Sequence, residues 1–437
     1  MNSFLKELEE TKINSTIKGI PFLKSKKVKK LKFEKLNILQ ENVQFPILSI
    51  DKKILLNNIK IMNNFAKKNN VSLAPHCKTF MSPQLINHHF KETWGITISN
   101  NQQLASIINL NVKNIIYGNL ITNESNLIQY LNIIKKFKNI SHIYYCIDSL
   151  FGLNLLIKLI KKNNYKFKIR ILIELGFKNG RCGIRNLKNF KEIIENLRKC
   201  PKNIIVNGLF FYEGAINEKK IITISKKIKN IIKFTFVCHN ELINNNIYKD
   251  KNIIITAGGS EYFDLVTSYF KEYNFKKNPK LILRPGSFIA YGHGHYENKI
   301  SHLRKRNLIS KLSKKNNIFF QPSLTLWSHV ISIKDKGIAI INFGKRDVSF
   351  DLGNPIPLKI YRNSKILKEF KNISANLKIF KLNDQHAFLR FNKNIKLHIG
   401  DLISFGVSHP CITFDKWRYF YIIDKKFYII DTYKTFF

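Results

Sequence analysis

The sequence predicts a (β/α)8 barrel followed by a smaller all-β domain. The chain has 437 residues, of which 44% are hydrophobic and 12% aromatic, so it is long enough for two globular domains. Between about residues 46 and 300, short apolar runs alternate with longer segments of helical period. Beyond residue 300, short strand-like runs separated by turn residues replace this alternation.

Eight strand-like runs and seven helical segments define the expected barrel. The strands are predicted at 72–76, 95–99, 114–118, 143–148, 168–175, 207–212, 252–257 and 280–284. The helices between them are predicted at 83–91, 102–110, 124–137, 150–162, 187–198, 218–233 and 261–273. An open doubly wound sheet would also alternate, but it seldom reaches eight units without a Gly-x-Gly-x-x-Gly signature, and the sequence has none.

The parts on either side of the barrel differ from it in pattern. Residues 1–45 are expected to carry a short acidic helix and then, in the lysine-rich stretch 24–35, to form an exposed N-terminal arm. The barrel domain is expected at 46–300 and the β-domain at 301–437. Strands of the β-domain are predicted at 324–333, 337–343, 358–361, 387–391 and 401–406, with no helix among them.

Composition narrows the classes of function. The formal net charge is +45, which would suit a nucleic-acid partner, but 63 of the 74 basic residues are lysines scattered along the whole chain. Nucleic-acid surfaces favour clustered charge and arginine, so we expect no nucleic-acid role. The six cysteines form no Cys-x-x-Cys pair, no secretion signal precedes them, and the apolar runs are too short to span a membrane. These features predict a soluble, cytoplasmic protein.

The stretch Leu-Ala-Pro-His-Cys-Lys-Thr-Phe-Met-Ser-Pro, residues 73–83, is the strongest candidate for chemistry. Lys78 lies just after the first expected strand and just before a helix that starts at Pro83, which is where the catalytic rim of a barrel lies. Most lysines are solvated surface charges. A lysine held on a rigid rim beside His76, Cys77 and Thr79 instead suits Schiff-base formation.

A glycine-rich turn follows the seventh expected strand. In Thr-Ala-Gly-Gly-Ser, Gly258 and Gly259 let the backbone approach an anion, and Ser260 can cap the next helix, as in barrel phosphate sites. A turn that merely caps a helix is equally common. Together with Lys78, the turn indicates a cofactor that carries both an aldehyde and a phosphate, namely pyridoxal phosphate.

Near the C-terminus, His409 and Cys411 flank a proline. In an extended chain, positions i and i+2 point to the same side, so the imidazole and the thiolate could share a zinc ion and leave positions open for a substrate oxygen. His-x-Cys alone is a weak signal, because a buried histidine beside a buried thiol is more common.

Charged and polar residues follow the fifth and sixth expected strands. Glu174, Arg181 and Arg185 lie in a glycine-containing stretch, where an arginine could hold the cofactor's phenolate oxygen or form only a surface ion pair. Tyr212 and Glu213 end the sixth strand, on the same rim. The turn after the eighth strand contains His293, His295 and Tyr296. These three residues could reach the site or could be ordinary loop residues.

As a set, these motifs resemble one enzyme family. Pro-His-Cys-Lys-Thr, Gly-Arg-Cys-Gly-Ile-Arg, Tyr-Glu-Gly, Gly-Gly-Ser-x-Tyr-Phe-Asp, Arg-Pro-Gly-Ser, Asp-Gln-His and Ser-His-Pro-Cys-x-Thr-Phe-Asp-Lys-Trp occur in this order over residues 45–420. They resemble the D-serine dehydratase and D-threonine aldolase group, whose members are pyridoxal-phosphate enzymes of fold type III with an alanine-racemase-like barrel. The stretch after the lysine resembles most closely the bacterial amino acid deaminase branch, which usually has glycine where this chain has Cys77.

The resemblance implies specific roles. Lys78 would form the covalent link to pyridoxal phosphate and act as the catalytic base, and His409 and Cys411 would bind zinc, since the aldolases have His-x-Asp at that place. The expected cofactor-binding residues are Lys78, His76, Arg181, Tyr212, Gly258, Gly259 and Ser260. A thiol at Cys77 could crowd the cofactor.

The implied reaction is β-elimination on a D-β-hydroxy amino acid such as D-serine, giving a 2-oxo acid and ammonia, in a homodimer. Retro-aldol cleavage or racemisation by the same lysine, and a non-catalytic cofactor-holding or nucleic-acid-associated protein, remain the alternatives.

Overall fold

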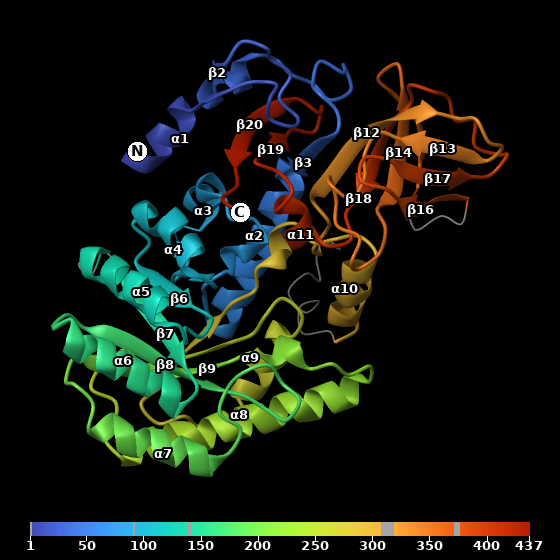
Figure 1. Cartoon of the computed structure of the whole chain (residues 1–437). Coiled ribbons are helices and arrows are strands. Elements are labelled where there is room, and N and C mark those ends of the chain that lie inside the picture. The colour runs from blue at the N-terminus through green and yellow to red at the C-terminus, as the bar shows by residue number, and fades with distance from the viewer. Residues whose placement is uncertain (1, 91, 138–140, 307–318, 371–375) are drawn as a thin grey trace. The chain divides into compact units, whose positions relative to one another are not determined.

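The computed structural model describes residues 2–90, 92–137, 141–306, 319–370 and 376–437 (Figure 1). The chain divides into two compact units. One unit comprises residues 1–62, 79–88 and 287–437, and the other comprises residues 63–78 and 89–286. We call them the β-unit and the barrel unit.

The barrel unit is built on an eight-stranded parallel sheet in the order β4-β11-β10-β9-β8-β7-β6-β5. Its strands are β4 (Ser72–Leu73), β5 (Ile96–Ile98), β6 (Asn114–Tyr117), β7 (His142–Ile147), β8 (Ile169–Leu175), β9 (Ile204–Phe211), β10 (Ile254–Ala257) and β11 (Lys280–Leu283). The two ends of the sheet meet where the Thr97 amide donates to the Pro75 carbonyl at 2.9 Å and His76 bridges to Thr97. The sheet therefore closes into a barrel, which confirms the predicted fold class.

Helices on the outer side connect successive strands (Figure 1). They are α4 (Asn101–Ile107), α5 (Glu124–Phe137), α6 (Leu150–Lys162), α7 (Leu187–Arg198), α8 (Ile221–Asn244) and α9 (Phe263–Phe270). Asn100, Ser149 and Asn186 cap three of these helices by accepting a first-turn amide. No helix in the described ranges, α8 included, is long and apolar enough to cross a bilayer.

The barrel interior explains the apolar strand runs. Every residue of β9 is buried, and β8 is buried except at Arg170, as expected where side chains face a core on both faces of a parallel sheet. One buried cluster takes a residue from most of the strands; it includes Ala74, Ile116, Tyr144, Cys146, Leu172, Phe210, Ile254 and Ile282. This packed core leaves the carboxyl ends of the strands as the place for a site.

The β-unit contains a largely antiparallel sheet in the order β15-β14-β18-β12-β13-β17-β16, to which β3, β19 and β20 add. The strands are β3 (Ile47–Asp51), β12 (Leu324–Ser332), β13 (Ile338–Ile341), β14 (Ile356–Arg362), β15 (Lys365–Glu369), β16 (Leu377–Leu382), β17 (Ala387–Phe391), β18 (Leu402–Gly406), β19 (Tyr419–Ile423) and β20 (Ile429–Lys434). Strand β3 pairs with β12 and β19, so the chain enters this sheet before it forms the barrel.

Three helices of the structure were not predicted from the sequence. Helix α2 (Lys52–Asn69) precedes the first barrel strand, α10 (His295–Lys305) follows the last, and α11 (Pro410–Phe414) interrupts the strands near the C-terminus. Helix α3 (Pro83–His89) starts at Pro83, as predicted.

The short acidic helix predicted at the start of residues 1–45 is confirmed by α1 (Ser3–Glu10), but the prediction that the rest of the segment is an exposed arm is wrong. The segment also forms the strand pair β1 (Lys12–Ile13) and β2 (Lys26–Lys27), and the 3-10 helix η1 (Val28–Phe33). Even within the lysine-rich stretch, Val28 and Leu31 are buried in a core cluster that also contains Trp327 and Tyr421 of the β-unit. The apolar residues between the lysines provide the burial, while the lysine heads can stay in water.

Candidate functional site

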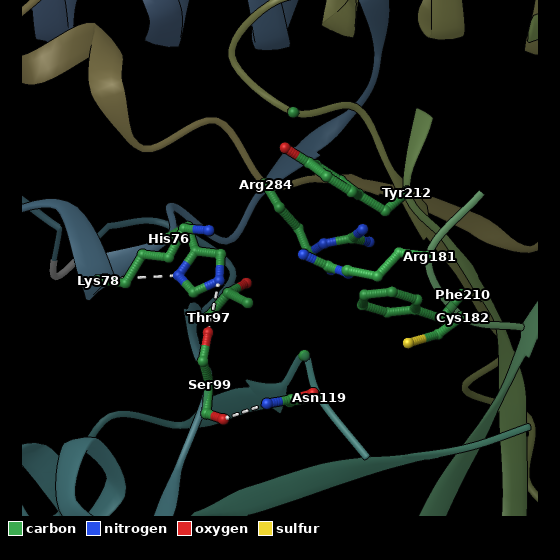
Figure 2. A pocket seen from close by; sticks show the side chains of 12 residues that line it. His76, Lys78, Thr97, Ser99, Asn119, Arg181, Cys182, Phe210, Tyr212 and Arg284 are labelled. Atoms are coloured by element: carbon green, nitrogen blue, oxygen red, sulfur yellow. Dashed lines mark hydrogen bonds between the residues drawn. The ribbon is translucent and has the colours of Figure 1, made fainter. Parts of the chain in front are cut away.

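A cavity of about 250 Å³ opens at the carboxyl ends of the barrel strands. Its lining residues all belong to the barrel unit and come from the ends of the strands or from the turns after them (Figure 2). They are His76, Lys78, Thr97, Ser99, Gly118, Asn119, Arg181, Cys182, Phe210, Tyr212, Gly259 and Arg284. This is the end of a barrel at which active sites are found.

Lys78 lies on the short 3-10 turn η2 (Cys77–Thr79), directly after β4. The turn is anchored because the His76 amide donates to the Pro285 carbonyl at 3.3 Å. The Lys78 amide in turn donates to His76 Nδ1 at 3.4 Å (Figure 2). Lys78 therefore lies on the rim of the barrel, between β4 and α3, as predicted from its place between a strand and a helix.

His76 is partly buried beside this lysine and bonds to the opposite wall. Its Nε2 lies 3.1 Å from Ser99 Oγ. Burial, reinforced by the charges of Lys78, Arg284 and Arg181, holds the pKa of His76 well below its usual value. The imidazole is therefore neutral at neutral pH and acts as a hydrogen-bonding group and not as a cation.

Cys77, which the sequence placed beside the lysine, does not line the cavity. Its side chain is fully buried, and the thiol donates to the Pro75 carbonyl at 3.7 Å. Burial raises the pKa of the Cys77 thiol, so it stays protonated and unreactive. The structure does not support the expected crowding of a cofactor by this thiol.

Two arginines make the cavity electropositive. The guanidinium of Arg181 lies 5.1 Å from the Tyr212 ring centre and that of Arg284 lies 3.8 Å from the Phe210 ring centre, so both reach between the two rings (Figure 2). Arg284 donates to Thr256 Oγ1 and to the Phe211 carbonyl, both at 2.7 Å. Burial lowers the pKa of Arg284 to about 10, which leaves it charged. With Lys78, and with no carboxylate among the described lining residues, the cavity suits an anionic ligand.

The glycine turn after β10 is held by a carboxylate. The amides of Gly258 and Gly259 donate to the two oxygens of Glu213, at 3.1 and 2.6 Å, and the Glu213 side chain is fully buried. Burial raises the pKa of Glu213, although these hydrogen bonds oppose the rise. Ser260 Oγ accepts the Gly286 amide at 2.9 Å and caps no helix, since α9 begins at Phe263. The two glycine amides that were predicted to meet a phosphate thus donate to Glu213.

Glycine is required in this turn for two reasons. Gly258 has a φ of +74°, which side chains rarely adopt. At Gly259, a Cβ would lie 3.0 Å from the Tyr212 ring and 3.4 Å from Glu213 Oε1. Since Gly259 lines the cavity, a side chain there would also reduce the space for a ligand.

Glu174 is a buried carboxyl at the end of β8. Burial, followed by the charge of Asp148, raises the pKa of Glu174 to about 7, although Arg284 and Arg181 favour the charged form. Below pH 4.5, the proton is bound in both the folded and the unfolded chain, so the group has no effect on stability. As the pH rises from about 4.5 to 7, the unfolded chain loses the proton first, and the free energy of unfolding therefore decreases.

We therefore expect Glu174→Gln to stabilise the protein at alkaline pH, by up to about 3 kcal/mol at pH 8. The gain should shrink steadily between pH 7 and pH 5, as followed by denaturant unfolding at each pH. Glu195→Gln, on the exposed surface of α7, is the matched control and should change the free energy of unfolding little at any pH. A gain for Glu174→Gln that does not depend on pH would contradict the raised pKa.

The predicted metal ligands lie in the β-unit. His409 is the N-cap of α11 and Cys411 is in its first turn, so the prediction that the two residues lie in an extended chain is wrong. Pro410 occupies the first turn, where its fixed φ favours the start of a helix. The two side chains still interact. Burial opposes charge on the imidazole, but hydrogen bonds with Cys411 and Asp351 outweigh it and raise the pKa of His409.

The Cys411 thiol donates to Thr79 Oγ1 at 3.4 Å, within the β-unit. Thr79 is the next residue after Lys78 in the chain. His409 Nδ1 lies 2.6 Å from Asp351 Oδ2. Within the residues that the structure describes, no cluster of three or more potential metal ligands occurs, so His409 and Cys411 form a two-residue candidate.

The structure brings most of the predicted cofactor-binding residues together. Lys78, His76, Arg181, Tyr212 and Gly259 line one cavity, while Gly258 and Ser260 flank Gly259 without lining it. Among the remaining candidates, Arg185 is exposed and donates to the Gly180 carbonyl, and His293 lines a different cavity of about 510 Å³ in the β-unit. The side chains of His295 and Tyr296 lie outside the described part of the structure.

Seven of the lining residues were not predicted, and for five of them a signal was present in the sequence. Thr97 and Ser99 come from the end of the second barrel strand and the residue after it, Asn119 lies just beyond the third, and Phe210 and Arg284 end the sixth and eighth. Selecting polar and aromatic residues at all eight carboxyl ends would have found them. Asp351 had no such signal, because it meets His409 across 58 residues of chain.

Comparisons with known proteins agree with this fold. Residues 323–423 match the family model described as "Putative serine dehydratase domain". No match is found among the curated proteins. Of the solved structures, D-threonine aldolase from Filomicrobium marinum is similar with a TM-score of 0.70 and 15% identity, over 90% of this chain and 95% of that one.

Two further solved structures show the same similarity. D-threo-3-hydroxyaspartate dehydratase from Delftia sp. gives a TM-score of 0.67 and 14% identity, over 91% of this chain and 98% of that one, and a variant of that enzyme is described in a metal-free form. Alanine racemase from Clostridium difficile, in complex with cycloserine, gives a TM-score of 0.58 and 14% identity, over 88% of this chain and 97% of that one.

The domain match also confirms the expectation that the chain is an enzyme of the lyase type, since a dehydratase is a lyase. Together with the barrel and the C-terminal sheet, it bears out the resemblance read from the sequence motifs: residues 323–423 belong to the serine dehydratase domain family, and the fold is that of the D-serine dehydratase and D-threonine aldolase group.

Proposed function

We propose that this chain is a pyridoxal-phosphate- and zinc-dependent lyase that removes the β-hydroxyl group and the amino group of a D-β-hydroxy amino acid, such as D-serine. The products would be a 2-oxo acid and ammonia. The observation that carries the proposal is the placement of the Lys78 side chain in a cavity of cationic character at the carboxyl ends of the barrel strands.

The cavity fits a phosphorylated aldehyde by charge and by covalent chemistry. Lys78, Arg181 and Arg284 supply positive charge without a lining carboxylate, and the amine of Lys78 can bond to a carbonyl carbon. Gly259 leaves room that a Cβ would take. Because Glu213 binds the amides of Gly258 and Gly259, we assign the phosphate to the cationic side chains that line the cavity, with Gly259 allowing close approach and Ser260 next to it in the same turn.

His409 and Cys411 fit zinc by their chemistry. A neutral imidazole and a thiolate are preferred zinc ligands, and two protein ligands leave coordination positions for a substrate oxygen. Both residues also lie within the segment 323–423, which matches the serine dehydratase domain, and this supports a role for them in the same reaction.

We assign the following roles in the reaction to the chain's own residues. Lys78 would hold the cofactor in the resting enzyme, and its free amine would serve as the base that takes the proton from Cα of the substrate. Arg181 and Arg284 bind anionic oxygens of the ligand. Neutral His76, fixed by Ser99, keeps the lysine turn in place without adding positive charge.

The bound groups supply the remaining chemistry. Pyridoxal phosphate, when bound, is an electron sink for negative charge at the substrate's Cα. Zinc, when bound, is a Lewis acid for the β-hydroxyl oxygen.

Ammonia release from a panel of D- and L-amino acids, with and without a chelator, tests the proposal. We expect release from D-serine or a close relative, none from the L-isomers, and loss of release after chelation. A preparation that shows the absorbance of bound cofactor but releases no ammonia from any member of the panel would contradict the proposed activity.

Retro-aldol cleavage is the second candidate, because the fold is also that of a D-threonine aldolase. Product analysis separates the two reactions, since cleavage of D-threonine yields glycine and acetaldehyde, whereas elimination yields 2-oxobutanoate and ammonia. We favour elimination because Cys411 stands where the aldolases of the family have aspartate. A homodimer and a cytoplasmic location stay predictions from the resemblance and the sequence.

A further inference from the structure

We propose that Asp351 and Thr79 are positioning residues for the metal site, Asp351 for the imidazole of His409 and Thr79 for the sulfur of Cys411. The inference rests on the zinc assignment under the proposed function and deepens it. Neither residue would bind the metal itself, since the described residues contain no cluster of three potential ligands.

The first argument is the hydrogen bond between His409 and Asp351. His409 Nδ1 lies 2.6 Å from Asp351 Oδ2, a distance typical of a charge-assisted bond in which the ring N–H donates to the carboxylate. A proton held on Nδ1 leaves the lone pair on Nε2, so Nε2 is the atom available to a metal. A carboxylate on the other ring nitrogen also makes the imidazole a stronger ligand.

The second argument is that the segment just before Asp351 is held against α11. Two residues before Asp351, the buried Ser349 accepts the His409 amide at 3.1 Å through its Oγ. The Ser349 amide donates to Thr413 Oγ1 at 3.1 Å, and the two hydroxyl oxygens lie 2.9 Å apart. The Trp417 indole also donates to the Asp347 carbonyl at 2.8 Å. The segment before Asp351 is therefore fixed to the helix turn that carries both ligands.

The third argument concerns the thiol. Cys411 Sγ donates to Thr79 Oγ1 at 3.4 Å, and Thr79 is almost fully buried, at 2% exposure. Zinc binding removes the thiol proton, so the Thr79 hydroxyl must then turn and donate its own hydrogen to the sulfur. A buried hydroxyl that keeps the sulfur paired in both states would stabilise the ligand in its binding position.

Zinc affinity, measured by competition with a chelator of known affinity, tests both residues independently of turnover. Asp351→Ala should weaken zinc binding about 10- to 100-fold. Asp351→Asn should weaken it less, because an amide oxygen still accepts the ring N–H but lacks the charge. Thr79→Val should weaken it and Thr79→Ser should restore it. Asp335→Ala, which removes an exposed aspartate of the same unit, is the matched control and should leave affinity unchanged.

Cobalt substitution gives a spectroscopic check. The thiolate-to-cobalt absorption band should persist in Asp351→Ala at saturating metal, because Cys411 still binds, but half-saturation should need more cobalt. Thermal melts of the metal-free variants should match the metal-free wild type. Should Asp351→Ala fail to fold, the comparison of Asp351→Asn with the wild type decides.

The outcomes separate this inference from the proposed function. If His409→Ala leaves zinc binding intact, the metal assignment fails, and the inference with it. If His409→Ala abolishes binding while Asp351→Ala and Thr79→Val bind zinc as tightly as the wild type, the assignment stands and the positioning roles are overturned.

Discussion

Replacing Lys78 with alanine should lower ammonia release from the best D-amino acid substrate about 100- to 10,000-fold, the loss expected when a general base is removed. The amine also holds the cofactor's carbonyl carbon in the proposed resting enzyme. The absorbance band of the lysine-bound cofactor should therefore vanish, even when pyridoxal phosphate is added in excess. Absorbance spectra and an ammonia assay on the same preparations measure both effects.

The matched control for this substitution is Lys113→Ala. Lys113 is exposed just before β6, at the amino end of a barrel strand and so at the opposite end from the cavity. In Lys113→Ala, the rate of ammonia release and the absorbance band of the bound cofactor should both be unchanged. An intact band and full turnover in Lys78→Ala would show that another group holds the cofactor.

Removing the metal should stop elimination and leave the cofactor in place. Lewis-acid stabilisation of a leaving oxygen contributes several kcal/mol, so we expect chelation or His409→Ala to lower the rate at least about 100-fold. The cofactor band should change little, because neither His409 nor Cys411 lines the cavity that contains Lys78. Steady-state rates and absorbance spectra before and after chelation give both quantities.

Adding zinc back distinguishes a direct from an indirect effect. The chelated wild type should regain its rate, whereas His409→Ala should not respond at the same zinc concentration. A chelated wild type that keeps its full rate would exclude any role for the metal in the reaction.

Much of the barrel could be predicted because its signals are local. Residues 124–137, 150–162 and 187–198 were predicted as helices with the bounds that α5, α6 and α7 have in the structure. Each alternates clearly with a buried strand, and Ser149 and Asn186 mark two of the starts. Four site residues could be predicted for the same reason, because each lies at or beyond the end of a predicted strand: His76, Lys78, Arg181 and Tyr212.

The remaining features depend on contacts between distant parts of the chain. Strand β3 joins β12 and β19, and no local pattern specifies this pairing. The segment before β3 was taken for an exposed arm because its apolar side chains pack against distant residues of the β-unit. The turn at Gly258 and Gly259 was predicted to meet a phosphate. The hydrogen bonds of its amides with Glu213 could not be predicted, because the Gly258 bond spans 45 residues of chain. The hydrogen bonds of Asp351 with His409 and of Thr79 with Cys411 are likewise invisible before folding.

The covalent attachment of the cofactor is the most direct test of the account. The protein, loaded with pyridoxal phosphate, can be reduced with borohydride and digested, and the peptides analysed by mass spectrometry. The account predicts a single stoichiometric pyridoxyl-phosphate adduct on Lys78, out of 63 lysines in the chain. An adduct on a different lysine, or an even scatter over many of them, would contradict it.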